Sequence, residues 1–381
     1  MNVITEARNS TFAEALALIE AQNEVKYDVV ANAAALRYQD GKLHLVDGGE
    51  PELTPDGVSL RDLVLDPTDG FGSDIAARLN IPRAYFRTME GTNVPLLDAN
   101  VNGWLGHSSN AGRKFMVRTF RDGNGGIARS LHSSSYSIVD NLAFIRATGE
   151  GIARSGHEYE VTGVNLSADF FRFDVLAPQV SVLAPALLDG YVSPFDRTRT
   201  GNAIPIVRAG VRCSNSETGR GMTKVEPWIR FEVCSNGMTL TKFAEDLTMR
   251  QVHRGARHDV GVVTLSQDTL AAQLKALTGK VADSMASFLD EKWLQEQVDL
   301  MTAKAGKSVP ASQALPTITR VAGALHLTGT ERDAILDIFM GSGQMTAGGV
   351  MQAMTAHAQQ VASPDRAAHL EGNALEALAL V

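Results

Sequence analysis

The hydrophobic and polar positions divide the chain into three zones with different periodicities. Residues 1–100 open with an amphipathic helix at 12–23, followed by alternating strand patterns at 27–38 and 42–46. Between these strands stands Asp40-Gly41, which is typical of a hairpin turn. Two short helices follow, one capped by Ser73 and ending before Pro82, the other opened by Pro95. This zone predicts a small mixed α/β N-terminal region.

Residues 101–262 predict a twisted sheet with one embedded helix. The helix begins near Asp140, and the order is strand, strand, helix, then a run of strands, which favours an α+β fold over alternating βαβ units. Cations alternate with apolar residues in several strands, as at Ile229 and Arg230. We therefore expect a mostly antiparallel sheet with one buried face and one basic face. The strand patterns lie at 114–120, 127–132, 158–166, 169–177, 204–213 and 226–234.

Residues 263–381 predict an all-helical C-terminal domain. From 265 to 304 apolar residues recur every three or four positions, the spacing of an amphipathic helix. Thr328 with Glu331 forms a capping box, Thr346 precedes another helical pattern, and Ser363-Pro364 places a cap before a proline. We expect these helices to form a small bundle that packs on the sheet or supports self-assembly.

Composition places the chain among soluble globular proteins. It has 44% hydrophobic and 20% charged residues, and no apolar run approaches the ~18 residues that span a bilayer. The first ten residues lack the pattern of a secretory signal, and two cysteines do not make a disulfide framework. These features predict a cytoplasmic protein that does not contact a membrane.

Charge is unevenly distributed along the chain. Residues 101–258 carry 19 Lys and Arg against 14 Asp and Glu, whereas the remainder carries 16 against 29. Sixteen of the 19 central cations are arginine, whose planar guanidinium suits bidentate phosphate contact and stacking on bases. A basic centre therefore favours a nucleic-acid partner, although arginines that only meet water on a sheet face would give the same pattern.

The common enzyme signatures are missing from the sequence. There is no phosphate-binding Gly-x-x-x-x-Gly-Lys-Ser/Thr loop, no Gly-x-Ser-x-Gly elbow and no His-Glu-x-x-His pair. Scattered Ser, His and Asp residues define no catalytic triad without geometry. The sequence thus leans towards a protein that is not an enzyme, and it predicts no cofactor.

A metal site is the alternative interpretation of the chemically densest stretch, residues 211–259. Cys213, Cys234, His253 and His258 supply ligand types that zinc prefers. However, twenty residues separate the cysteines, whereas zinc knuckles usually bring paired cysteines together on one tight turn. Free cysteines are among the most buried residues, so the competing expectation is two core thiols on adjacent strands, each followed by a Ser-Asn turn.

The nucleic-acid interpretation depends on the repeated central cations. A groove that follows a phosphate backbone needs such cations, and aromatic residues near them offer surfaces for base stacking. The candidates form a first hairpin, a second hairpin and a terminal His-Arg cluster: Arg113, Lys114, Arg118, Arg121 and Arg129; Arg212, Arg220, Lys224 and Arg230; and Arg250, Arg254 and Arg257.

Several of these segments resemble one known family. The runs ARSLHSSSYSIVDN, CSNSETGRG and WIRFEVCSNGM, followed by HRGARH, are similar to the phage and plasmid family named domain of unknown function 932. The resemblance covers about residues 60 to 260 and leaves out the helical zone. It implies a setting on phages, prophages and plasmids, with no established reaction. Ser134 stands where the family has an acidic residue, so a role of that acid does not carry over.

Two functions follow as hypotheses. The order of elements loosely resembles phage single-strand-annealing proteins, an analogy of fold alone. The first hypothesis is accordingly a phage-type protein of the host cytoplasm that binds single-stranded DNA, with possible roles in annealing during recombination or replication, and that forms homo-oligomers through its helical region. The alternative is a phage or plasmid protein without enzymatic activity that interacts with host proteins or has a regulatory role, with its acidic ends and helical bundle making the contacts.

Overall fold

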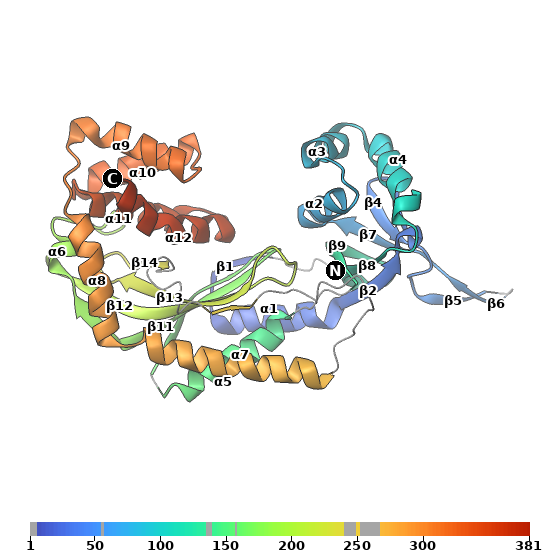
Figure 1. Ribbon diagram of the computed structural model, residues 1–381, viewed down its shortest axis with the longest axis horizontal. Coiled ribbons are helices and arrows are strands. Elements are labelled where there is room, and N and C mark those ends of the chain that lie inside the picture. The colour runs from blue at the N-terminus through green and yellow to red at the C-terminus, as the bar shows by residue number, and fades with distance from the viewer. Residues whose placement is uncertain (1–5, 55–56, 135–138, 157, 240–248, 252–266) are drawn as a thin grey trace.

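Two large sheets and a helical region make up the protein. The computed structural model describes residues 6–54, 57–134, 139–156, 158–239, 249–251 and 267–381. The predicted α+β class and the all-helical C-terminal region are confirmed. Figure 1 shows the C-terminal helices of residues 311–380 at one end of the molecule and the helices of residues 69–105 at the other.

The smaller sheet joins the N-terminal strands to the first hairpin of the central zone. Its order is β2-β8-β9-β7-β4-β3, with β7 and β9 parallel and the other pairs antiparallel. Asp40 and Gly41 both have positive φ (54° and 74°), as a tight hairpin turn between β3 and β4 requires. The strands are β2 Lys26–Asn32, β3 Leu36–Gln39, β4 Lys42–Leu45, β7 Leu63–Pro67, β8 Lys114–Asp122 and β9 Gly125–Ser133.

This pairing differs from the single central sheet that the sequence predicts. Phe115, Val117 and Leu131 are buried with Leu43 and Leu65 in a core of their own, so β8 and β9 pack with the N-terminal strands. The sequence predicts the strands β8 and β9 but not the strands they pair with, because alternation along one strand does not specify which strand lies beside it. The domain limits near residues 100 and 262 stay a prediction.

The larger sheet is antiparallel throughout. Its order is β1-β10-β11-β12-β13-β14, and β15 also pairs with β13. The strands are β1 Ala7–Ser10, β10 Glu160–Leu166, β11 Phe171–Leu183, β12 Ile206–Asn215, β13 Thr223–Phe231, β14 Asn236–Thr239 and β15 Met249–Gln251. A separate two-stranded sheet consists of β5 Pro51–Thr54 and β6 Gly57–Leu60.

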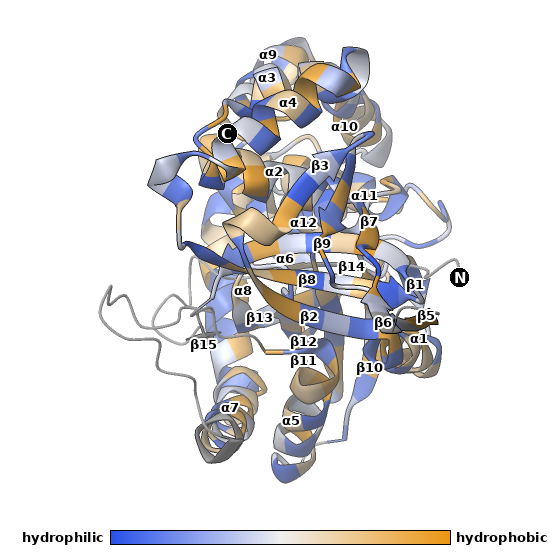
Figure 2. Cartoon of the chain, turned by 90° about the vertical axis from the view of Figure 1, so that its right-hand side faces the viewer, coloured by the Kyte–Doolittle hydropathy of each residue, from blue (hydrophilic) through white to orange (hydrophobic). Residues whose placement is uncertain are grey.

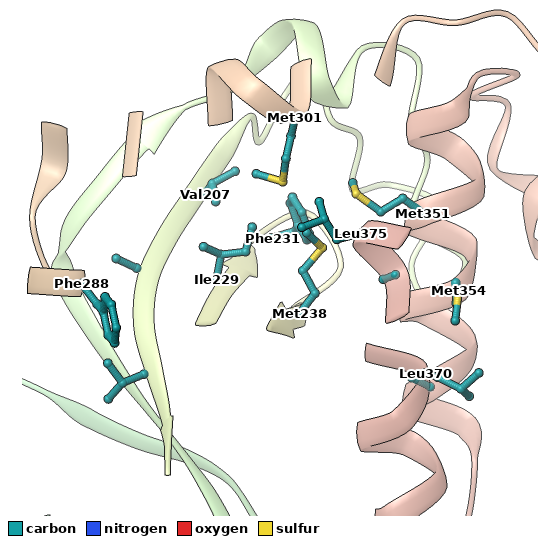
Figure 3. Packing of buried hydrophobic residues seen from close by; sticks show 14 of the residues in the cluster. Val207, Ile229, Phe231, Met238, Phe288, Met301, Met351, Met354, Leu370 and Leu375 are labelled. Carbon is teal, nitrogen blue, oxygen red and sulfur yellow. The ribbon is translucent and has the colours of Figure 1, made fainter. Parts of the chain in front are cut away.

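The larger sheet has one apolar face, covered by helices. Phe173 packs edge-on against Phe12 of α1 Phe12–Val25 and against Phe144 of α5 Asn141–Arg154. The helix α7 Gln267–Phe288 lies beside α5 on this side, opposite α11 and α12 (Figures 1 and 2). Figure 3 shows the same core near β14, where Phe231 and Met238 lie close to Met301 and Leu375.

Most helix starts agree with the predicted caps. Thr328 and Glu331 form the capping box of α10, and Thr346 and Ser363 cap α11 and α12. The Ser73 prediction was wrong: Thr68 caps α2, and the Ser73 hydroxyl donates to the Asp69 carbonyl within the first turns. The remaining helices are α2 Asp69–Arg78, α3 Arg83–Thr92, α4 Val94–Leu105, α6 Pro185–Leu188, α8 Glu291–Ala305, α9 Ala311–Ala324, α10 Gly329–Ser342, α11 Ala347–Gln360 and α12 Pro364–Leu380.

Among the described helices, none combines the length and the apolar character that crossing a membrane would require.

Candidate nucleic-acid interface

Arg118 is buried, so it is not part of an exposed basic face as the sequence suggested. Its side chain is 0% exposed and donates to Asp28 at 3.1 Å, to Asp140 at 2.7 Å and to the Glu217 carbonyl at 2.8 Å. Burial by itself would lower the pKa of Arg118, but the neighbouring carboxylates outweigh burial and raise it. The guanidinium is therefore a fixed internal charge that joins β8 to the larger sheet.

Arg129 is also buried, next to the same acidic residue. It donates to a Glu217 carboxylate oxygen at 2.9 Å and stacks on Phe120 at 4.0 Å. The other Glu217 oxygen accepts from the Asn141 backbone at 2.6 Å. Burial would raise the pKa of Glu217, but Arg129 and Arg118 outweigh it and lower the pKa. The expectation of an exposed cation is wrong here because the β12–β13 turn covers the first hairpin.

Arg212 is the third buried arginine. It makes a bidentate pair with Asp174 at 2.7 and 2.8 Å and a further ion pair with Glu371 of α12 at 2.6 Å. Asp174 stands opposite Arg212 in the β11–β12 register, so the first pair is made across the polar face of the sheet. Because α12 supplies Glu371, this arginine ties the helical region to the sheet and is not exposed for phosphate.

The other cations of the first hairpin lie nearer the surface but face the N-terminal elements. Arg113 donates to Asn110 and stacks on Phe115, whereas Arg121 stacks on Tyr27 at 4.8 Å and pairs with Glu50 at 3.6 Å. Lys114 is exposed at the start of β8. The first hairpin therefore does not gather its five predicted cations on one surface.

The metal candidates do not form a described site. Cys213 is buried in β12 and Cys234 in the turn after β13. Burial raises the pKa of the Cys213 thiol, which disfavours the thiolate that a metal needs. His253 and His258 lie outside the described residues, as do Arg254 and Arg257. No group of three metal-ligating side chains occurs in the part of the chain that the structure describes.

The polar face of the larger sheet carries a groove beneath α12, which we call the outer groove. It encloses about 670 Å³, within the ~300–1,000 Å³ that is usual for ligand pockets. Four cations, two carboxylates and the ring of Phe170 line it. The full set of lining residues is Phe170, Arg172, Arg212, Ser214, Arg220, Gly221, Met222, Lys224, Glu226, Asp365, Ala368, His369, Gly372 and Asn373. Four cations, each with a carboxylate partner, and an aromatic ring thus meet in one hollow.

Phe170, just before β11, and Arg172, within β11, form a stacked pair at this groove. The Arg172 guanidinium lies 4.2 Å from the centre of the Phe170 ring. A Cβ on Gly221 would come within 2.4 Å of that ring, so the missing side chain at Gly221 makes room for Phe170. Arg172 also pairs with Asp365 at the start of α12. The pair is held in place from both the sheet and the helical region.

The remaining predicted cations of the second hairpin border this face. Arg220 pairs with Asp74 at 3.0 Å, and Lys224 meets Glu226 at 3.4 Å. Lys224 keeps 31% of its side chain exposed, and the β15 residue opposite it in register is Arg250. Arg230 lies 3.6 Å from Glu232 and lines an adjoining cavity.

That adjoining cavity, the inner cavity, encloses about 480 Å³ and shares Arg172, Arg212 and Ala368 with the outer groove. Trp228 lines it, with its ring across Gly210: a Cβ there would meet the ring at 2.8 Å. The shared residues make the two hollows neighbours along α12. Both hollows lie between the larger sheet and α12.

The sequence predicted Arg212, Arg220 and Lys224 here but missed Phe170, Arg172 and the α12 wall. The signal for Arg172 was present, because Phe171 and Phe173 alternate with Arg172 and Asp174 in the segment DFFRFD. No local pattern could have placed α12 over the sheet, since residues 170 and 365 are far apart in sequence.

Comparisons with known proteins give no match: neither a family model, nor a curated protein, nor a solved structure corresponds to this chain. The resemblance to the phage and plasmid family stays a prediction.

Proposed function

We propose that the protein binds single-stranded DNA in the outer groove, as a phage-type protein of the host cytoplasm. The observation that carries this proposal is the stack of Arg172 on Phe170 beside the partly exposed cations Arg220 and Lys224. Cations attract the phosphates, while aromatic rings and guanidinium planes accept bases regardless of sequence.

A single strand suits this site better than a duplex. The groove is closed on one side by α12 and measures about 670 Å³, which is the scale of a small ligand or of a few unpaired nucleotides. A duplex would present its bases inside the helix, where Phe170 and Arg172 could not stack on them. The strand would pass Lys224 and stack on the pair formed by Phe170 and Arg172.

The test is binding of a fluorescent oligothymidine at low and moderate salt. We expect binding that weakens steeply with salt, because each phosphate contact releases counterions. Lys224→Ala should weaken binding about 3- to 10-fold and lower the salt slope by about 1. Phe170→Ala should weaken it about 5- to 100-fold, the range for loss of a stacking contact.

Lys42→Ala is the matched control. Like Lys224, Lys42 is a partly exposed lysine with one carboxylate neighbour, Asp66 at 2.7 Å, but it lies in β4 of the smaller sheet. Its loss should leave binding unchanged. Absence of binding at low salt would overturn the proposal, and equal effects of Lys42→Ala and Lys224→Ala would remove the site from the outer groove. Arg118 and Arg212 are unsuitable for this test because they are internal.

Annealing of complementary strands is a further part of this proposal. Strand annealing by the wild-type protein, reduced in Phe170→Ala to the extent that binding is reduced, would support it. Binding without acceleration of annealing would limit the function to single-strand binding. Competition with oligouridine would distinguish DNA from RNA.

The second candidate is a protein that acts on a host protein through the helical region. The observation that favours it is a set of exposed apolar side chains there, with Leu300 at 47%, Leu315 at 52% and Met340 at 45% exposure. Host partners captured after nuclease treatment by the wild type, but not by Leu315→Asp, would favour this function, especially if oligonucleotide binding is absent.

A further inference from the structure

The hairpin β5–β6 projects from the molecule as an arm with exposed leucines. Leu53 is 86% exposed and Leu60 51% exposed, and Figure 1 shows the hairpin pointing away from the rest of the chain. Within the described residues, β5 and β6 pair only with each other. A lone two-stranded hairpin is marginally stable in water, so an arm of this kind gains stability when a partner covers its leucines.

A groove of fitting chemistry lies between α5 and α7. It encloses about 670 Å³ and is lined by Leu142, Ala143, Ala147, Ala271 and Leu274 among others. The two helices approach each other closely at Gly151, where a Cβ would lie 2.6 Å from that of Val281. Most groove residues precede this crossing on both helices, and Arg154 follows it on α5. Small alanine side chains leave room there for a partner's leucines.

The rim of this groove is basic. Arg146 and Lys275 are exposed, and neither has an ion pair with another described residue. The acids at the rim are already engaged, since Glu150 pairs with Arg154 and Asp140 with Arg118 and Lys26. By contrast, residues 51–60 contain two acidic residues and no Lys or Arg. An acidic, leucine-bearing arm is therefore complementary in charge and polarity to a basic-rimmed apolar groove.

From this complementarity we infer that the β5–β6 arm of one copy docks in the α5–α7 groove of a second copy. The arm points away from its own α5 and α7 (Figure 1), so the contact is made between molecules. Arm and groove are different surfaces, which makes the interface heterologous: each copy offers both halves, and assembly proceeds to a ring or an open filament. The inference concerns self-assembly without DNA and does not depend on the proposed function.

The experiment is particle mass by sedimentation and mass photometry at rising protein concentration, without nucleic acid. The wild type should form oligomers. The arm variant Leu53→Asp/Leu60→Asp and the groove variant Arg146→Glu/Lys275→Glu should each be monomeric, with thermal unfolding close to that of the wild type. Leu183→Asp is the control, because Leu183 is 65% exposed in β11, away from both surfaces, and it should still assemble.

Mixing the two monomeric variants is the decisive measurement. The arm variant keeps an intact groove and the groove variant keeps an intact arm, so a one-to-one mixture should form dimers and nothing larger. A mixture that stays monomeric would overturn the inference, as would a wild type that is monomeric at all concentrations. Loss of assembly in the arm variant alone would also overturn it, by indicating that arms contact arms.

Discussion

Three arginines of this protein serve as internal ion-pair partners. Arg118, Arg129 and Arg212 are each 0–7% exposed and bound to carboxylates. A buried guanidinium whose donors are satisfied is tolerated, but one without its partners is costly. Alternation of arginine with apolar residues therefore did indicate the polar side of each strand, but sequence could not tell whether water or another element covers that side.

Arg118→Met should destabilise the protein strongly. Methionine has a volume similar to that of arginine but carries no charge and no hydrogen-bond donor. Asp140 would keep Lys26 as its ion-pair partner, and the Glu217 carbonyl would lose the hydrogen bond from Arg118. We expect the free energy of unfolding to fall by about 3 kcal/mol, as when one partner of a buried pair is removed. Urea denaturation measures it. Lys114→Met, on the exposed start of the same strand, should change stability by less than about 0.5 kcal/mol.

At the scale of elements, the sequence predicted what local chemistry determines. Thr328 with Glu331, and Ser363 before Pro364, identified helix starts because capping involves residues three positions apart. The pairing of β8 with β2, and the position of α12 over the sheet, depend on contacts between distant segments. Three of the four cations of the outer groove, Arg212, Arg220 and Lys224, were predicted from the sequence, while Arg172, Phe170 and the α12 wall were not.

The crossing of α5 and α7 gives a sharp test of packing between elements. Gly151→Ala should destabilise the protein by about 1–3 kcal/mol, because the new Cβ would meet Val281 at 2.6 Å and the Thr278 carbonyl at 2.7 Å. Gly149→Ala, two residues earlier in the same helix, meets nothing within 4 Å. It should stabilise by up to about 1 kcal/mol through helix propensity. Thermal or urea unfolding compares the two, and similar effects would contradict the described crossing.

On the scale of the whole molecule, two hydrophobic cores meet at a buried polar cluster around Glu217. One core belongs to the smaller sheet with α2, α3 and α4, and the other to the larger sheet with the C-terminal helices. Glu217, in the turn between β12 and β13, contacts Arg118 and Arg129 of the smaller sheet and the backbone at the start of α5. Part of the free energy that holds the two cores together therefore comes from the Glu217 carboxylate, and this part depends on pH.

Acidification should weaken this junction. The pKa of Glu217 is lower in the folded protein than its ordinary value near ~4.3. The ionised carboxylate thus adds stability that is complete above about pH 5 and is lost as the pH falls through the lowered pKa. Glu217→Gln lacks this contribution at every pH. It should be less stable than the wild type by about 3 kcal/mol at pH 7, and the difference should shrink progressively below about pH 4.

Urea denaturation from pH 7 to pH 3 measures that difference, and hydrogen exchange locates it. Protection should fall first in β8 and β9, because Arg129 of β9 loses its carboxylate partner and Arg118 of β8 loses a nearby negative charge, while β11 and β12 stay protected by the larger core. Glu150→Gln is the control, because Glu150 pairs with Arg154 on the surface of α5 with 57% of its side chain exposed; its effect should be below about 0.5 kcal/mol at all pH values. A difference between wild type and Glu217→Gln that is constant with pH would show that the carboxylate charge does not join the two cores.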